Sequence, residues 1–322
     1  MESRACVLSH STPKFAKQIS SKYGRMASYD VEGDLKENHG RTISRNRIQA
    51  IAECVGQLVS DKESEWEYDI PIKDEQTAYI VFSLDGTTAN MVSEGWREVM
   101  SGTISFYNKN GDRLHSLYIG QAPEYGKGEF KKRLQREIDQ AKTQFPKAIY
   151  IGLADGAIDN WSFLETQVDY SILDFWHAAE YLTPVSKMVS RSRYEQKQWL
   201  EQKRHQLRHD KGGAEMILKE MIGYEKKRLS IAKRKALEKS ITYFTNHKHQ
   251  MDYPTYADRN MPIGSGVTEA ACKVLVKQRF CNSGMRWKAP TMQNVLNIRA
   301  NLISKGRWEQ FWTKVNELAM AA

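Results

Sequence analysis

Residues 148–182 read AIYIGLADGAIDNWSFLETQVDYSILDFWHAAEYL, and this stretch decides the fold class because it twice runs an apolar segment into an acidic residue. Residues 148–154 are too continuously apolar for a strand with one face in water, so we interpret them as a buried strand that delivers Asp155 at its carboxyl edge. A second apolar run delivers Asp174, and His177 follows three residues later, on the same face of a helix. Two such sites side by side indicate a metal-dependent active site in an α/β sheet.

Length and composition limit the class of protein. A chain of 322 residues can bury a substantial core, as two domains or as one domain with an insertion. No apolar run approaches the length of a membrane span, and the first residues lack the apolar core of a signal peptide. We therefore expect a cytoplasmic protein. Neither a zinc cluster nor a disulfide framework is indicated, because the four cysteines lie far apart and form no CxxC pair: Cys6, Cys54, Cys272 and Cys281.

The positive charge is concentrated in one segment. The formal net charge is +9, and residues 191–239 hold 15 Lys and Arg against 7 Asp and Glu. A localised basic surface favours a polyanion, usually nucleic acid, through counterion release. The alternative is an ordinary solvated helix surface.

The N-terminal region, residues 1–76, is predicted to be helical and to end in an acidic linker. Residues 40–59 resemble the second half of a helix-turn-helix, with Ser44 as the cap and an apolar stripe behind it. Arg45 and Arg47, together with Arg41, would then stand at the helix start, where recognition helices meet DNA. An amphipathic surface helix without DNA contacts explains the same pattern. The stripe consists of Ile48, Ile51, Ala52 and Val55.

The order of elements after residue 77 predicts a mixed sheet. A strand ending at Asp85 is followed by a hairpin with an Asn110-Gly111 turn, a helix, and the strand that precedes Asp155. The hairpin makes the first three strands antiparallel, and the helical crossovers make the later ones parallel. This is the order of the ribonuclease H-like fold. The predicted segments are strands at 78–84, 103–107, 114–119, 148–154 and 171–173 and a helix at 128–142.

The second half of the chain is predicted to be mostly helical. Residues 77–183 form the first part of the core, 184–258 form a basic helical insertion, and 259–322 return to the core as C-terminal helices. A helix beginning near Val267 places three side chains spaced by four residues on one face. They form either weak surface ion pairs or a metal-binding carboxylate followed by phosphate-binding lysines. The three are Glu269, Lys273 and Lys277.

Three carboxylates are the candidates for a metal site: Asp85, Asp155 and Glu269. Mg²⁺ and Mn²⁺ prefer oxygen ligands and keep positions open for water and phosphate. Two such ions, about 4 Å apart, activate the attacking oxygen and stabilise the leaving one in displacement at phosphorus. We therefore expect the three carboxylates to converge within about 10 Å.

The motifs resemble a known family, the DDE transposases of bacterial insertion sequences, most closely the ISKra group. The resemblance spans roughly residues 78–322, and the combination of motifs in this order is specific. They are SLDG at 83–86, EGWREVMSGTI at 94–104, LADGA at 153–157, DFWHAAEYL at 174–182, IGSGVTEAACK at 263–273, SGMRW at 283–287 and GRWEQFW at 306–312.

The resemblance implies a ribonuclease H-like catalytic core with Asp85, Asp155 and Glu269 as its metal-binding triad and two Mg²⁺ or Mn²⁺ ions. It implies that Asp174 and His177 lie near the scissile phosphate, as in hAT and Mutator-like elements. The expected partners are the terminal repeats, target DNA and at least one further copy of the chain, since two element ends must meet, in a nucleoid-associated location. The expected DNA contacts are Arg45, Arg47, Lys273, Lys277, Arg279 and Arg286.

The function expected from the sequence is therefore DNA strand cleavage and strand transfer at insertion-sequence ends. Two alternatives stay open. The chain is equally compatible with a ribonuclease H-like endonuclease without strand transfer, because the active site is the same. It is also compatible with a domesticated, non-catalytic DNA-binding protein, which predicts salt-sensitive binding that survives loss of the acids.

Overall fold

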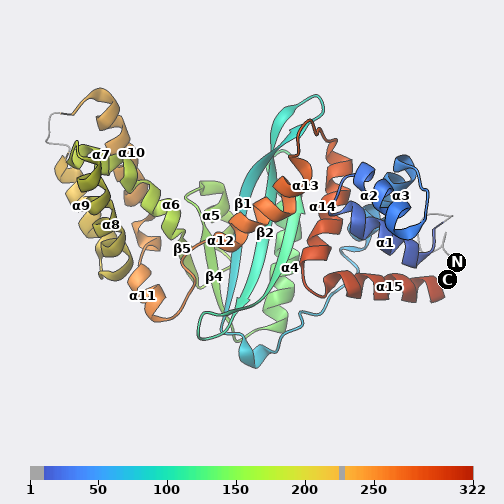
Figure 1. Cartoon of the computed structure of the whole chain (residues 1–322). Coiled ribbons are helices and arrows are strands. Elements are labelled where there is room, and N and C mark those ends of the chain that lie inside the picture. The colour runs from blue at the N-terminus through green and yellow to red at the C-terminus, as the bar shows by residue number, and fades with distance from the viewer. Residues whose placement is uncertain (1–10, 225–228, 322) are drawn as a thin grey trace.

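The computed structural model describes residues 11–224 and 229–321. The molecule is elongated, with a sheet at its centre and a helical arm at each end (Figure 1). In the described part of the chain, no helix is both long enough and apolar enough to cross a membrane.

The central sheet is mixed, as the order of predicted elements requires, and its strand order is β3-β2-β1-β4-β5. The first three strands are antiparallel to one another, whereas β4 is parallel to β1 and β5 is parallel to β4. Gly111 adopts a φ of 81° in the turn that joins β2 to β3. The strands are β1 (Tyr79–Met91), β2 (Gly95–Tyr107), β3 (Arg113–Gln121), β4 (Ile149–Ala154) and β5 (Tyr170–Leu173).

The first strand is longer than its apolar run predicts. The prediction that it ends at Asp85 is wrong, since Asp85 lies inside β1, opposite Ser101 of β2. The extra residues pair with β2 over their whole length, whereas the parallel pairing with β4 ends at Phe82 and Gly152. Asp85 therefore lies just beyond the last residue pair that β1 shares with β4.

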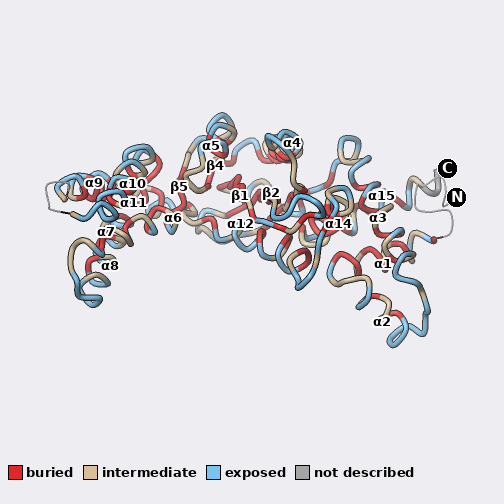
Figure 2. The backbone as a smooth tube through the Cα atoms, turned by 90° about the horizontal axis from the view of Figure 1, so that it is seen from above, coloured by how far each residue is buried: buried red, intermediate tan, exposed pale blue. Residues whose placement is uncertain are grey.

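Helices cover both faces of the sheet (Figure 2). On one face lie α4 (Gly128–Gln144) and α5 (Ile158–Leu164), and the buried side of α4 is the predicted stripe of Phe130, Leu134, Ile138 and Ala141. The helix that contains Glu269 lies on the opposite face. It consists of α12 (Gly266–Ala271), a π-helical turn η3 (Cys272–Lys277) and α13 (Gln278–Phe280).

The region predicted as a basic insertion forms a helical arm next to β5 (Figure 1). Its apolar side chains, among them Trp199, Leu207 and Phe244, belong to the same continuous core as the sheet. The arm is therefore packed against the sheet rather than tethered to it. Its helices, with α6 leading into the arm, are α6 (Phe175–Glu180), α7 (Leu182–Val189), α8 (Arg193–His209), α9 (Gly213–Tyr224), α10 (Ile231–His247) and α11 (Tyr253–Asp258).

The N-terminal helices share a core with the last two helices of the chain. Ser44 caps α3 by accepting a hydrogen bond from the Arg47 amide, and the predicted apolar stripe is buried. Gly56 is required where α3 crosses α14, because a Cβ there would lie 2.3 Å from the carbonyl oxygen of Asn294. The helices are α1 (Pro13–Tyr23), α2 (Ser28–His39), α3 (Arg45–Lys62), α14 (Ala289–Ile303) and α15 (Arg307–Ala321).

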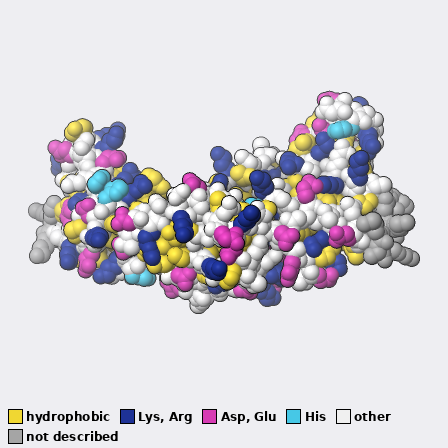
Figure 3. Space-filling view, turned by 90° about the horizontal axis from the view of Figure 1, so that it is seen from below, with side chains coloured by type: hydrophobic (Ala, Val, Ile, Leu, Met, Phe, Trp, Pro, Cys, Tyr) yellow, Lys and Arg dark blue, Asp and Glu magenta, His cyan; other side chains and the backbone are white. Residues whose placement is uncertain are grey.

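The two arms project to the same side of the molecule. Figure 2 shows α8 at one end and α2 at the other extending beyond the sheet on the side that carries α12. The space-filling view shows a broad hollow between the two projections (Figure 3). The face that carries the Glu269 helix is therefore the concave face.

Candidate active site

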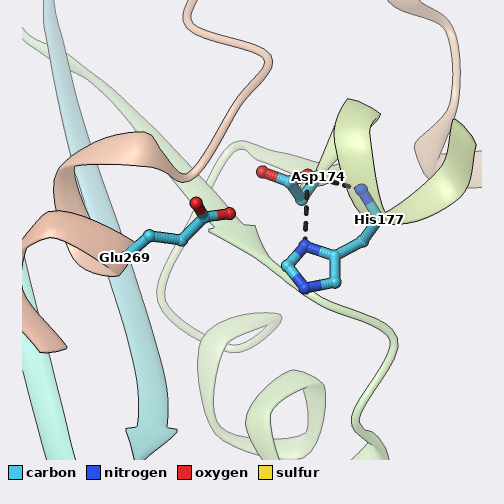
Figure 4. Close-up of side chains that lie close together, drawn as sticks. All are labelled: Asp174, His177 and Glu269. Atoms are coloured by element: carbon cyan, nitrogen blue, oxygen red, sulfur yellow. Dashed lines mark hydrogen bonds and ion pairs between the residues drawn. The ribbon is translucent and has the colours of Figure 1, made fainter. Parts of the chain in front are cut away.

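Three predicted side chains meet where β5 ends and α12 begins: Asp174, His177 and Glu269 (Figure 4). One carboxylate oxygen or ring nitrogen from each of the three lies within 4.8 Å of those of the other two. Asp85 and Asp155 belong to the same neighbourhood, since their charges act on each other and on His177. We call these five residues the acid cluster. They come from four segments that are far apart in the sequence.

Asp174 is a structural residue within this cluster. It is the N-cap of α6, is 0% exposed, and accepts a hydrogen bond from the His177 amide at 2.8 Å. Its second oxygen accepts a hydrogen bond from the Ser265 amide, in the loop before α12. Burial alone would raise the pKa of Asp174, but the hydrogen bonds from His177 and Ser265 lower that pKa to about 2. The carboxylate therefore ties α6 to the segment that carries Glu269.

His177 is held as a cation by Asp174. Its Nδ1 lies 3.2 Å from Asp174 Oδ1, as an ion pair rather than a well-aligned hydrogen bond. This contact with Asp174 raises the pKa of His177 to about 9 against the opposing effect of burial, and the charge of Asp155 raises it further. The ring is half-buried and positively charged at neutral pH, which suits it to an anionic partner.

Asp85 lies in β1, and its carboxylate Oδ2 has only a weak hydrogen-bond donor, a thiol. Oδ1 accepts a hydrogen bond from the Gly86 amide at 2.7 Å, and Oδ2 accepts a contact from Cys272 Sγ at 3.4 Å. Burial raises the pKa of Asp85, and the negative charge of Asp155 raises it as well. Two carboxylates that repel each other in this way are stabilised by a cation between them.

Asp155 is oriented by its own loop after β4. Oδ1 accepts hydrogen bonds from the Ala157 amide and from Asn160 Nδ2, both at 3.1 Å. The Trp161 indole donates to the Asp155 carbonyl at 2.6 Å and closes the turn. These contacts fix one carboxylate oxygen and leave Oδ2 without a hydrogen bond among the described residues.

Glu269 reaches the cluster from an anchored helix. The Thr268 hydroxyl lies 2.6 Å from the Thr103 hydroxyl of β2, and both are buried. The Glu269 side chain is exposed and accepts only a long hydrogen bond, 3.4 Å, from Ser265 Oγ. A π-helical turn follows directly, a feature that occurs frequently at functional sites.

The chemistry of the donors decides which residues fit a metal ion. Asp174 does not fit, because it is fully buried and protein donors occupy both of its oxygens. His177 does not fit while its ring is protonated. Asp85, Asp155 and Glu269 fit, since each presents a carboxylate oxygen and none forms an ion pair with Lys or Arg in the described residues. Hard oxygen ligands of this kind suit Mg²⁺ or Mn²⁺.

The predicted DNA contacts divide into exposed and buried side chains. Lys273 and Lys277 are exposed along the helix that follows Glu269, and Arg286 is exposed in the loop after it. Arg45 is exposed at the start of α3, 3.5 Å from Glu32, whereas Arg47 is half-buried.

The expectation that Arg279 contacts DNA is contradicted by its burial. The side chain is 2% exposed, and its Nε donates to the Tyr23 carbonyl at 3.0 Å. Its guanidinium lies over the rings of Tyr23 and Trp287, at 4.8 and 5.0 Å from their centroids. Arg279 therefore joins α1 to the C-terminal region and has no surface to offer to a phosphate.

Several supporting residues were missed by sequence reasoning. Ser265 and Thr103 form bonds between segments that are distant in the sequence, whereas Asn160 bonds to Asp155 within its own loop. Only the role of Asp174 carried a local signal, because aspartate is a preferred N-cap and can accept the amide three residues on.

Comparison of the chain with models of protein families gives no match, and comparison with curated protein sequences gives no match either.

Proposed function

We propose that the protein is a metal-dependent phosphoryl transferase that cuts and joins DNA strands in the manner of a DDE transposase. The observation that carries the proposal is the acid cluster itself: three carboxylates without a cationic partner in the described residues, next to one imidazolium. Metal ions would balance the carboxylates, and a phosphate would approach the imidazolium. The motif resemblance points to the same chemistry.

The topology supports a ribonuclease H-like core. Three antiparallel strands followed by two parallel ones, in the order β3-β2-β1-β4-β5, match the order expected from the sequence. The two strand-borne acids sit on adjacent strands, with Asp85 in β1 and Asp155 directly after β4. Adjacent parallel strands deliver such side chains to one edge of a sheet, where ligands of α/β sheets bind.

The residues of the acid cluster would have different roles. Asp85, Asp155 and Glu269 would hold Mg²⁺ or Mn²⁺, which supplies activation of the attacking oxygen and stabilisation of the leaving one. His177 would donate a hydrogen bond to a phosphate oxygen and offset charge that develops there. Asp174 keeps that ring charged and oriented. With water as the attacking group the product is a nick, and with a DNA 3′-hydroxyl the product is a joined strand.

The concave face suits a DNA partner. The helix on this face carries the exposed Lys273 and Lys277, Arg286 is exposed in the loop after it, and the arm at one end contains the basic segment 191–239. Basic side chains on a surface that faces the site would hold the phosphate backbone without reading sequence. Because two element ends must be joined, we expect at least two copies of the chain on the DNA.

The test is to incubate the protein with Mg²⁺ or Mn²⁺ and labelled DNA that carries the repeats flanking the coding sequence, and to separate nicked from joined products. Joined products support the transposase. Nicks without joined products favour the alternative endonuclease. DNA binding without either product favours the non-catalytic alternative.

A further inference from the structure

Trp176 is a large apolar side chain that is exposed to solvent. It is 56% exposed, although the residues on either side of it, Phe175 and His177, are buried and half-buried. An exposed indole ring gains free energy when a ligand covers it, in proportion to the apolar area removed from water. Single exposed apolar residues are common on protein surfaces, so exposure alone does not indicate a ligand site, and the location of Trp176 has to be considered.

That position is beside the acid cluster. A Cβ placed on Gly264 would lie 3.4 Å from Trp176 Cδ1 and 3.9 Å from Asp174 Oδ2. The indole therefore lies along the loop that leads from Gly264 through Ser265 to Glu269.

A cation lies next to Phe175, the aromatic neighbour of the indole. Phe175 packs edge-on against Trp176 with ring centroids 5.2 Å apart, and Arg208 of α8 lies 6.0 Å from the Phe175 centroid. Arg208 is exposed and forms no ion pair with an acid in the described part of the chain. The helical arm thus brings a positive charge next to Phe175, the ring that packs against Trp176.

We propose that Trp176 stacks an unpaired nucleobase of a DNA strand beside the acid cluster, with Arg208 next to the backbone phosphate. An aromatic platform with a neighbouring cation is how proteins hold single-stranded nucleic acid without reading its sequence, because every base has a π-face. Bases in a duplex are stacked on each other, so the ligand is a single strand or a frayed end. The inference rests on the proposed function, because it takes DNA as the ligand.

The experiment measures binding of an end-labelled single strand of about 20 nucleotides, longer than the roughly 4–16 nucleotides that a single-strand-binding fold covers. A blunt duplex of the same sequence is the comparison. Fluorescence anisotropy is recorded with Ca²⁺ replacing Mg²⁺, so that the carboxylates have a counterion. The variants are Trp176→Ala, Trp176→Phe and the control Trp96→Ala, which removes an indole that is 64% exposed at the β1–β2 turn.

We expect Trp176→Ala to weaken binding of the single strand at least about fivefold, the lower end of a lost base–aromatic stack. Duplex binding stays within about twofold, and Trp176→Phe restores most of the affinity for the single strand. Equal affinities of Trp176→Ala and wild type overturn the inference, as does an equal loss in Trp96→Ala or in duplex binding. If the Ala variant fails to fold, Trp176→Leu takes its place, because it keeps apolar bulk and removes the ring.

The failure of this inference is distinguishable from failure of the proposed function. If wild type cuts DNA but the loss of the indole leaves single-strand binding unchanged, only the proposed role of Trp176 is wrong. If wild type binds neither DNA form, both the proposed function and the role of Trp176 are wrong.

Discussion

Arg299 of α14 donates a hydrogen bond from Nε to the carbonyl oxygen of Leu275, 2.8 Å away in the π-helical turn that follows Glu269. Its other nitrogens donate to the carbonyls of Val274 and of Gly24, at the end of α1. The side chain is 6% exposed and forms no ion pair with an acid in the described residues. Burial and the charges of Arg279 and Arg25 lower the pKa of Arg299 to about 10. A buried cation thus joins the N-terminal helices to the turn that follows the helix of the third carboxylate.

Replacing Arg299 by Met should therefore lower the free energy of unfolding by about 2–4 kcal/mol, because three carbonyls lose their donor and only part of this loss is offset by removing a buried charge. Urea unfolding measures the change. The control is Arg25→Met, an exposed arginine whose loss should cost less than about 0.5 kcal/mol. Equal unfolding free energies of the two variants would show that the three hydrogen bonds of Arg299 do not stabilise the fold.

The ion pair between Asp174 and His177 predicts a pH dependence of stability. The pKa of His177 is raised from 6.5 to about 9, so the folded state binds the proton more tightly than the unfolded chain. The stabilisation is complete below pH 6.5 and is lost as the pH rises through about 9. The pKa of Asp174 is lowered from 3.8 to about 2, so its contribution is complete above pH 3.8 and is lost as the pH falls through about 2.

The measurement compares wild type with His177→Gln by urea unfolding across this range. We expect the difference in unfolding free energy to be largest near pH 6 and to shrink between pH 6.5 and about 9. A difference that stays constant between pH 6.5 and about 9 would mean that the pKa of His177 is not raised in the folded protein.

Gly156, directly after Asp155, allows the helical arm to pack against the site. A Cβ at this position would lie 2.5 Å from Cε2 of Tyr243 in α10, and Tyr243 stacks on Tyr181 with ring centroids 3.6 Å apart. We expect Gly156→Ala to destabilise the protein by about 1–3 kcal/mol through overpacking. Gly223→Ala is the control, because nothing lies within 4 Å of the added atom.

A double mutant identifies the cause. In a Tyr243→Ala background, the same Gly156→Ala change should cost markedly less, because the clashing ring has gone. Equal costs in both backgrounds would assign the effect to the backbone of the loop instead of to the contact with α10.

The basic arm should contribute to DNA affinity through charge alone. Lys235 and Lys239 lie on one side of α10, and Lys239 approaches the ring of Tyr181 at 5.6 Å. Changing both to Gln should reduce the slope of log affinity against log salt by about 1.8, if both contact phosphates. Lys132→Gln with Lys147→Gln is the matched control, since both lysines are exposed, Lys132 in α4 on the other face and Lys147 in the loop between α4 and β4. An unchanged slope in the first variant would remove this surface from the interface.

Local patterns were sufficient to predict most of the sheet but little of its surroundings. The continuous apolar run before Asp155 predicted a buried strand, and Asn110-Gly111 predicted the hairpin turn, because both signals depend on adjacent residues. The far half of β1 was missed because polar residues interrupt its apolar pattern. It is held by pairing with β2, by the buried Ala89 and Met91, and by backbone bonds to Trp287. Such pairing becomes visible only when distant segments are placed together.

The same limit applies to the site. The three carboxylates were predicted from strand ends, a helix face and a family resemblance, but the bond between Ser265 and Asp174 joins segments 91 residues apart. Arg279 was predicted to contact DNA together with Lys273 and Lys277. Its burial depends on Tyr23, whose position relative to the C-terminal region no sequence pattern indicates.

The central claim is that Asp85, Asp155 and Glu269 form one metal-dependent site for phosphoryl transfer on DNA. The most direct measurement is the single-turnover rate of DNA cleavage with Mn²⁺ for wild type, Asp155→Asn and Asp159→Asn. Asp159 is an exposed acid four residues away and serves as the matched control. We predict that Asp155→Asn slows cleavage about a hundredfold or more, while Asp159→Asn cleaves at the wild-type rate. Equal rates for all three proteins would contradict the account.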